Sequence, residues 1–175
     1  SSGMEKHKVG EAVSLRNLID YAISVSDNSA HLMLIDYIGF SNLKAYGKSL
    51  GGSVILTGGD LYGNQTAADT NIYLKKAYQI ITENKEYGEF LKTIMDNNER
   101  NAFNTEDIKI YHKYGSYASN YHDIGLSLEN NPYSISIFTL HEYTNYTEVV
   151  QGIHQKIREL HTLFYKEREN YCKNL

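Results

Sequence analysis

The chain of 175 residues is 41% hydrophobic and 22% charged, with a formal net charge of −4. This length suits one domain with its own core, and the composition is ordinary for a globular protein. Acidic and basic residues are interspersed, and no apolar run approaches the roughly 20 residues of a membrane span, so neither nucleic-acid binding nor a transmembrane segment is expected. Cys172 is the single cysteine, which excludes an intrachain disulfide and a cysteine metal site.

Three helical patterns follow one another near the N-terminus. Ser14 is expected to cap the first helix, because apolar residues recur after it at helical spacing: Leu15, Leu18, Ile19, Ala22 and Ile23. A second helix is expected over 29–38, ending at Gly39, where a glycine C-cap fits. Ser41 is expected to cap a third, shorter helix that ends before Gly51.

A loop and two further helices are expected next. Residues 57–68 are rich in Gly, Asn, Asp and Thr, which is typical of a loop. Asp69 or Thr70 is expected to cap the following helix, whose buried face should carry Ile72, Tyr73, Ala77, Ile80 and Ile81. Another helix is expected over about 86–95.

Strand patterns and one long helix complete the chain. The strands are expected over 108–114, 123–128 and 133–140, and the residues 130–132 between the last two favour a hairpin turn. A helix over about 147–170 should bury an apolar stripe made of Val150, Ile153, Ile157, Leu160 and Phe164. Helices therefore precede an antiparallel sheet and a terminal helix.

Two short motifs stand out in this arrangement. Ser26-Asp27-Asn28 lies between the first two helices, and Lys113-Tyr114-Gly115 follows it on the first expected strand. Their order matches S-D-N and K-T-G, two of the three fingerprints of penicillin-recognising serine enzymes. Either motif alone would be an ordinary helix terminus or a solvated strand lysine, so the interpretation depends on their pairing.

On these motifs and the neighbouring 121–125 segment, Tyr-His-Asp-Ile-Gly, the chain resembles class A β-lactamases and related serine hydrolases of Gram-positive bacteria. The resemblance runs from about Gly10 to the terminal helix. It implies an α/β (α+β) fold in one domain over 1–175, with an all-helical lobe over about 10–100 and an antiparallel sheet with the C-terminal helix over about 105–175. Relative to the family, the N-terminal helix and strands are expected to be missing.

The resemblance also implies roles in acyl transfer for the motif residues. Ser26 would relay a proton to the leaving nitrogen, held by the ammonium of Lys113 across a cleft. Asn28 would bind the substrate's side-chain carbonyl, whereas Asp27 would brace the turn. No metal or other cofactor is expected; the histidines at 154 and 161 are expected to be structural.

Two residues after Lys113 match the family pattern, whereas Tyr114 and the 57–64 loop depart from it. Gly115 would let substrate backbone approach the strand, and the N–H of Ser116 would form half of an oxyanion hole. Tyr114 stands where the family has Thr or Ser, which should alter recognition of the substrate carboxylate. The 57–64 loop contains no glutamate to activate a deacylating water, and Asp60 is a weak substitute.

The S-x-x-K nucleophile is not in its expected place before Ser26. Ser41-Asn42-Leu43-Lys44 matches by letter but follows S-D-N, and Ser41 is interpreted as a helix cap. The nucleophile is therefore expected upstream of Ser1, and the 175 residues alone are expected to be inactive. Without that segment, exposed apolar surface or a homo-oligomer is expected.

Two functions remain open from the sequence. The first is a β-lactamase-like serine hydrolase that acts on a β-lactam or a peptidoglycan-type amide outside the cytoplasm. The second is a non-catalytic binding or sensor module that holds such ligands in the same cleft. Tyr114 and the absent loop glutamate favour the second.

Overall fold

The structure is a computed structural model that describes residues 3–52, 64–103, 107–140 and 145–174. A short 3-10 helix, η1, precedes six helices and three strands in the described residues. In chain order these are η1 (Met4–Lys6), α1 (Leu15–Ser24), α2 (Asn28–Ile38), α3 (Phe40–Ser49), α4 (Ala67–Glu83), α5 (Lys85–Asp96), β1 (Ile110–Tyr117), β2 (Asn120–Ser127), β3 (Tyr133–Leu140) and α6 (Tyr146–Lys173).

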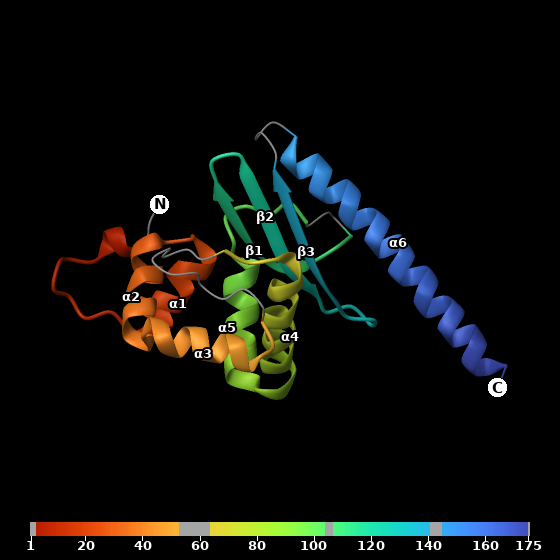
Figure 1. Ribbon diagram of the computed structural model, residues 1–175, viewed down its shortest axis with the longest axis horizontal. Helices are drawn as coiled ribbons and strands as arrows, with labels where there is room; N and C mark the ends of the chain where they lie inside the picture. The colour runs from red at the N-terminus through yellow and green to blue at the C-terminus, as the bar shows by residue number, and fades with distance from the viewer. Residues whose placement is uncertain (1–2, 53–63, 104–106, 141–144, 175) are drawn as a thin grey trace.

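The strands form one antiparallel sheet in the order β1-β2-β3, and helices cover both of its faces. Helices α4 and α5 pack on one face, the start of α6 lies on the other, and α1 to α3 stand beside the β1 edge (Figure 1). The predicted α+β class, with a helical group and an antiparallel sheet, is confirmed. None of the described helices combines the length and the apolarity needed to cross a bilayer.

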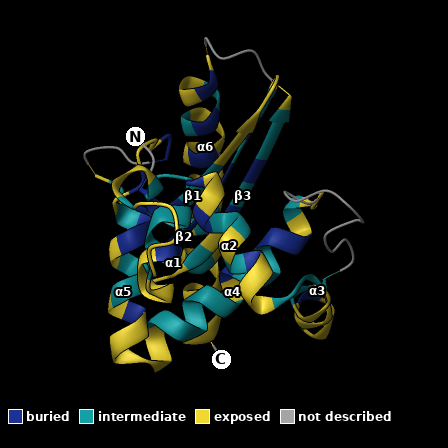
Figure 2. Cartoon of the chain, turned by 90° about the vertical axis from the view of Figure 1, so that its left-hand side faces the viewer, coloured by how far each residue is buried: buried dark blue, intermediate teal, exposed yellow. Residues whose placement is uncertain are grey.

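The sheet separates two apolar clusters, because alternate strand residues point to opposite faces. The cluster under α6 contains Ala102, Phe103, Ile110, Tyr121, Ile135, Ile137, Tyr146 and Val150. The cluster under α4 and α5 centres on Leu74, Met95 and Leu126. Buried residues consequently concentrate in the strands and on the helix faces that meet them (Figure 2).

Capping side chains set several helix starts. Ser14 accepts a hydrogen bond from the Asn17 N–H at 3.2 Å, which confirms the predicted start of α1. The prediction of Asp69 or Thr70 as the next cap is wrong, because Thr66 caps α4 and accepts from the Asp69 N–H at 3.1 Å. The Thr66 hydroxyl donates back to the Asp69 carboxylate at 2.8 Å, so Asp69 is the reciprocal partner of the cap and lies within the first turn.

Gly39, and not Ser41, is the N-cap residue of α3. Gly39 has φ 83°, a conformation that glycine adopts without a Cβ clash, and it both ends α2 and precedes α3. Ser41 is the second residue of α3, so its predicted role as a cap is wrong. The polar residue after the glycine resembled a cap by type, but the backbone turn at Gly39 sets the boundary.

The sheet matches the expected strands with a shift in the first two. β1 begins at Ile110 and continues to Tyr117, and β2 begins at Asn120, so a tight turn at Ala118 and Ser119 joins them. β3 spans the predicted residues, and the hairpin between β2 and β3 is confirmed. Lys113 therefore lies in the middle of β1, which is an edge strand of the described sheet.

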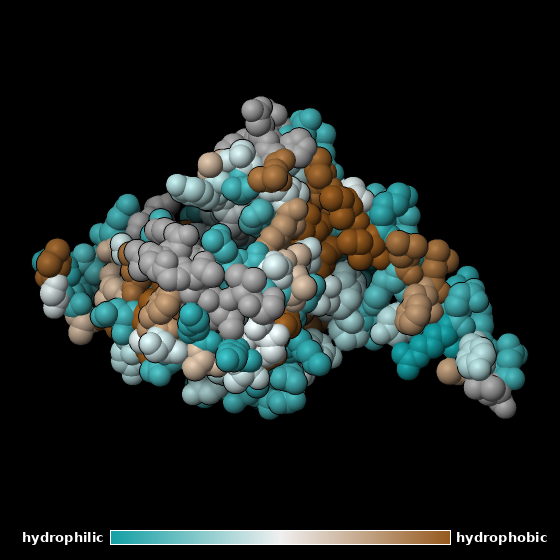
Figure 3. Space-filling model, in the orientation of Figure 1, coloured by the Kyte–Doolittle hydropathy of each residue, from teal (hydrophilic) through white to brown (hydrophobic). Residues whose placement is uncertain are grey.

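The burial expected along the terminal helix is wrong for most of its length. Val150 is fully buried, but Leu160 and Phe164 of the same stripe are 66% and 64% exposed. Helix α6 starts against the sheet and then runs beyond it (Figure 1), and hydrophobic side chains continue along it (Figure 3). Helical periodicity identified the apolar face, but it could not tell whether a neighbour lies against that face.

Candidate active site

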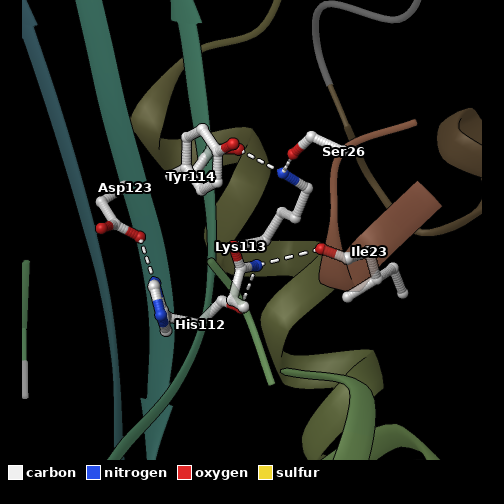
Figure 4. A network of polar contacts seen from close by, with 7 residues as sticks. Ile23, Ser26, His112, Lys113, Tyr114 and Asp123 are labelled. Atoms are coloured by element: carbon white, nitrogen blue, oxygen red, sulfur yellow. Dashed lines mark hydrogen bonds and ion pairs between the residues drawn. The ribbon is translucent and has the colours of Figure 1, made fainter. Parts of the chain in front are cut away.

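The connection between α1 and α2 presents the Ser26 hydroxyl toward β1. Ser26 has φ 52°, in the left-handed region that is uncommon for residues other than glycine. Such a sharp turn reverses the chain within a few residues, so the C-terminal end of α1 and the N-terminal end of α2 lie next to each other. The Ser26 side chain points at the Lys113 ammonium (Figure 4).

Asp27 holds this turn in place. One oxygen of its carboxylate accepts from the Ala30 N–H at 3.0 Å and caps α2, and the other accepts from the Met4 N–H at 2.8 Å. The side chain is buried, so these charge-assisted hydrogen bonds replace water at the carboxylate. Asp27 therefore fixes the backbone that carries Ser26.

Lys113 reaches from β1 to this turn. Its Nζ contacts the Ser26 Oγ and donates to the Tyr114 carbonyl oxygen at 2.5 Å. Burial lowers the pKa of Lys113 from 10.5 to about 8, and the negative charge of Asp123 opposes that effect. At neutral pH the side chain is therefore mostly an ammonium, which can donate to the serine hydroxyl and attract an anion.

Asn98 joins the two halves of the site, and no sequence motif pointed to it. Its amide nitrogen donates to the carbonyl oxygen of Ile23 at 3.0 Å and to that of His112 at 3.2 Å. Ile23 lies three residues before Ser26, and His112 directly precedes Lys113 (Figure 4). This one buried amide therefore ties the end of α1 to β1, where the hydroxyl and the ammonium meet.

Tyr114 and Arg100 add an aromatic surface and a second cation. The Tyr114 ring stacks on Tyr121 with centroids 6.0 Å apart, and the Lys113 Nζ lies 4.2 Å from its centroid. The exposed Arg100 guanidinium lies 5.3 Å from the same centroid. Cations at these distances are attracted to the ring. Arg100 follows α5 without any motif, so only its place in the fold reveals it.

The other predicted site residues lie at different positions relative to Ser26 and Lys113. Asn28 is the exposed first residue of α2, next to the Ser26 turn. Gly115 and Ser116 continue β1 and are exposed, and a Cβ added at Gly115 would meet no atom within 4 Å. Ser41 is exposed on α3, which packs chiefly against α2. Asp60 lies outside the described residues.

The assembled groups suit proton transfer and the binding of an anion. A hydroxyl in contact with an ammonium can pass a proton to a leaving group, and two cations beside an exposed strand can attract a carboxylate. Among the described residues, no group of three or more His, Cys, Asp or Glu side chains is arranged to hold a metal ion.

Comparison with known proteins places this chain in a family. The model of the family described as "Beta-lactamase enzyme family" matches residues 1–161. No curated protein matches the chain. Among solved structures, PBP-A is similar with a TM-score of 0.74 and 17% identity, over 89% of this chain and 66% of PBP-A.

Two β-lactamase structures extend this likeness. A class A β-lactamase from Bacteroides cellulosilyticus has a TM-score of 0.66 and 24% identity, over 82% of this chain and 61% of the other. A β-lactamase from Sphaerobacter thermophilus has a TM-score of 0.70 and 17% identity, over 86% and 64%. The chain thus spans about two thirds of the length of these structures, and the likeness shows a shared fold.

Proposed function

The chain belongs to the β-lactamase enzyme family, and on that premise we propose that it carries the proton-transfer and substrate-binding part of a serine hydrolase. The substrate would be a β-lactam or a peptidoglycan-type amide, cleaved through an acyl-enzyme. The observation that carries this proposal is the contact between the Ser26 hydroxyl and the Lys113 ammonium, contributed by elements far apart in the sequence.

In the proposed chemistry, Ser26 donates a proton to the leaving nitrogen of the substrate. When a serine nucleophile attacks the carbonyl, its proton must reach the nitrogen as the C–N bond breaks. Ser26 gives its hydroxyl proton to that nitrogen and receives another from the nucleophile's side, so it ends unchanged. Lys113 keeps the Ser26 oxygen in position by donating to it and stabilises negative charge that develops nearby.

We assign carboxylate binding to Lys113 together with Arg100. The Lys113 Nζ and the Arg100 guanidinium lie 4.2 Å and 5.3 Å from the centroid of the Tyr114 ring, and Tyr114 has no short hydroxyl to offer as Thr or Ser would. A guanidinium binds a carboxylate with two parallel hydrogen bonds, so Arg100 can replace the missing hydroxyl. Asn28 and the N–H of Ser116 are proposed to bind the remaining polar atoms of the substrate.

We place the nucleophile in a segment outside the 175 residues. Ser41 is exposed on α3, and Ser26 already serves the proton relay. The apolar residues left exposed along α6 and the outer edge of β3 offer a surface against which such a segment could pack. Because peptidoglycan lies outside the cytoplasm, we propose an extracytoplasmic location.

A non-catalytic binding module is the second candidate function. It is favoured by Tyr114 in place of Thr or Ser and by the lack of a glutamate in residues 57–64. Such a module would keep the cations and the aromatic surface for binding but would not turn over its ligand.

Labelling with a fluorescent penicillin separates these functions. We expect an intact form that includes the nucleophile segment to become covalently labelled, while the 175-residue chain remains unlabelled. Rapid hydrolysis of nitrocefin would identify a β-lactamase, and stable label a penicillin-binding enzyme. Reversible binding without label would favour the binding module. Absence of both binding and labelling in the folded intact form would overturn the proposal.

A further inference from the structure

A groove lies between α6 and the turn that joins β2 to β3. Its volume is about 640 Å³, which is within the range of about 300–1,000 Å³ that is usual for small-molecule pockets. Residues 129–131 of the turn form one wall, and α6 forms the other. This turn and α6 lie on the side of the sheet away from α1 and α2 (Figure 1). The groove is therefore separate from the candidate active site around Ser26 and Lys113.

The α6 wall of the groove is one stripe of the helix. The lining residues follow one another at helical spacing and so share one side of α6: Arg158, His161, Thr162, Tyr165, Lys166 and Glu169. The exposed apolar residues Leu160 and Phe164 are not among the residues that line the groove. The groove is thus polar and aromatic, and it is distinct from the apolar stripe of the same helix.

Contacts between the turn, β3 and α6 keep the groove in shape. The Arg158 guanidinium binds the Glu129 carboxylate at 2.9 Å, so the helix is joined to the turn. The His161 ring packs between two tyrosine rings, with centroids 4.8 Å from that of Tyr133 on β3 and 4.7 Å from that of Tyr165. Because His161 and Tyr165 are both half-buried, two rings of the groove are held in place before any ligand binds.

The charges on the two walls balance. Glu129 and Glu169 contribute two carboxylates, and Arg158 and Lys166 contribute two cations. A ligand with a net charge would therefore lose beside one pair of walls' charges what it gains beside the other. The side-chain amides of residues 130–131 add donors and acceptors without charge.

An uncharged ligand with many hydroxyl groups matches this set of side chains. Each hydroxyl of a sugar both donates and accepts, so it can bond to carboxylates and amide oxygens as well as to ammonium, guanidinium and amide nitrogens. The apolar face of a sugar ring can pack on an aromatic side chain, and Tyr165 also offers a hydroxyl at its edge.

We propose that the groove between α6 and the β2–β3 turn is a binding site for an uncharged oligosaccharide. A sugar ring packs on Tyr165, and the sugar hydroxyls bond to the charged and amide side chains of the two walls. The site lies apart from Ser26 and Lys113, and it does not depend on the proposed function.

An NMR titration of the ¹⁵N-labelled 175-residue chain with tetra-N-acetylchitotetraose tests this site. We expect the amide signals of residues 129–131 and 158–169 to shift to saturation, while that of Lys113 stays unchanged. Tyr165→Ala should raise the Kd by about tenfold, because it removes the ring on which the sugar packs. Tyr165→Phe keeps the ring and should keep the binding. The matched control is Tyr171→Ala, because Tyr171 is exposed on the same helix outside the groove.

Three results would overturn the proposal: no saturable shift in these residues, an unchanged Kd in folded Tyr165→Ala, or an equal loss in Tyr171→Ala. If Tyr165→Ala does not fold, the titration of the native chain decides, and shifts outside the groove would reject the site. Binding of a charged peptide at the same residues, without binding of the sugar, would reject the ligand class. Failure of penicillin labelling would reject the proposed function and leave this titration unaffected.

Discussion

The junction between α1 and β1 and the exposed part of α6 differ in the interactions they make. Buried hydrogen bonds link α1 to β1, whereas most of the apolar face of α6 has no covering surface among the described residues. At the junction, the buried Asn98 amide makes specific hydrogen bonds, because it donates to the Ile23 carbonyl oxygen of α1 and to the His112 carbonyl oxygen of β1. Helix α6 buries only Tyr146, Val150 and His154 among its described residues. Directional hydrogen bonds fix the distance between the elements that carry Ser26 and Lys113, whereas an apolar stripe only requires that some surface covers it.

The largest expected effect comes from removing the Lys113 ammonium at the junction between α1 and β1. Lys113→Ala should slow acylation of the intact form by about 100-fold or more, because the Ser26 hydroxyl loses its donor and the substrate its cation. Asp60→Ala should have a far smaller effect. The measurement is the rate of fluorescent-penicillin labelling, with the surface variant Lys109→Ala as the control. Equal and small effects of Lys113→Ala and Asp60→Ala would contradict a catalytic role for this group.

Removing the Asn98 amide, which links α1 to β1, should lower the stability of the fold. Asn98→Asp preserves shape but removes the amide donor, which leaves the Ile23 and His112 carbonyl oxygens unpaired beside a buried acid. We expect a loss of about 2–3 kcal/mol in the free energy of unfolding, measured by urea denaturation. Asn97→Asp is the matched control. The side chain of Asn97, the residue next to Asn98, is exposed, so this substitution should change the free energy of unfolding little. Equal losses in both variants would show that Asn98 has no special role.

The two ends of the α6 stripe should respond differently. Val150→Ala removes buried methyl groups and should cost about 2 kcal/mol, whereas Leu160→Ala should cost less than about 0.5 kcal/mol in the 175-residue chain. Thermal or urea denaturation measures both. In the intact form, a larger cost of Leu160→Ala would reveal a segment that covers this part of α6; an unchanged small cost would argue against one.

The smallest effect is a pH dependence at the junction. The pKa of Lys113 is lowered to about 8 in the folded chain, so between pH 8 and 10.5 the unfolded chain binds the proton more tightly. Stability from this group therefore rises with pH in that window, by about 1 kcal/mol from pH 8 to pH 9. Lys113→Met should lack this rise. The urea midpoints of both proteins at the two pH values give the difference, and parallel behaviour would exclude a lowered lysine pKa.

The sequence predicted the elements well where local chemistry sets them. The serine cap at 14, the glycine end at 39 and the β2–β3 hairpin depend on neighbouring residues, so they could be inferred from type and spacing. It failed where a similar residue competed for the same role: Thr66 took the cap assigned to Asp69 or Thr70, and Gly39 took the one assigned to Ser41. The paired motifs also identified the family, which the match over residues 1–161 confirms.

Tertiary structure alone decided the contacts that form the site. Ser26 and Lys113 meet because the chain folds the helical part against β1, and Asn98 and Arg100 lie beside them without any sequence motif. Likewise, the periodic stripe of α6 gave no sign of its exposure. Spacing along a chain encodes helices, strands and caps, because these form between near neighbours. Distances between residues far apart depend on how whole elements pack, and only the folded chain contains that information.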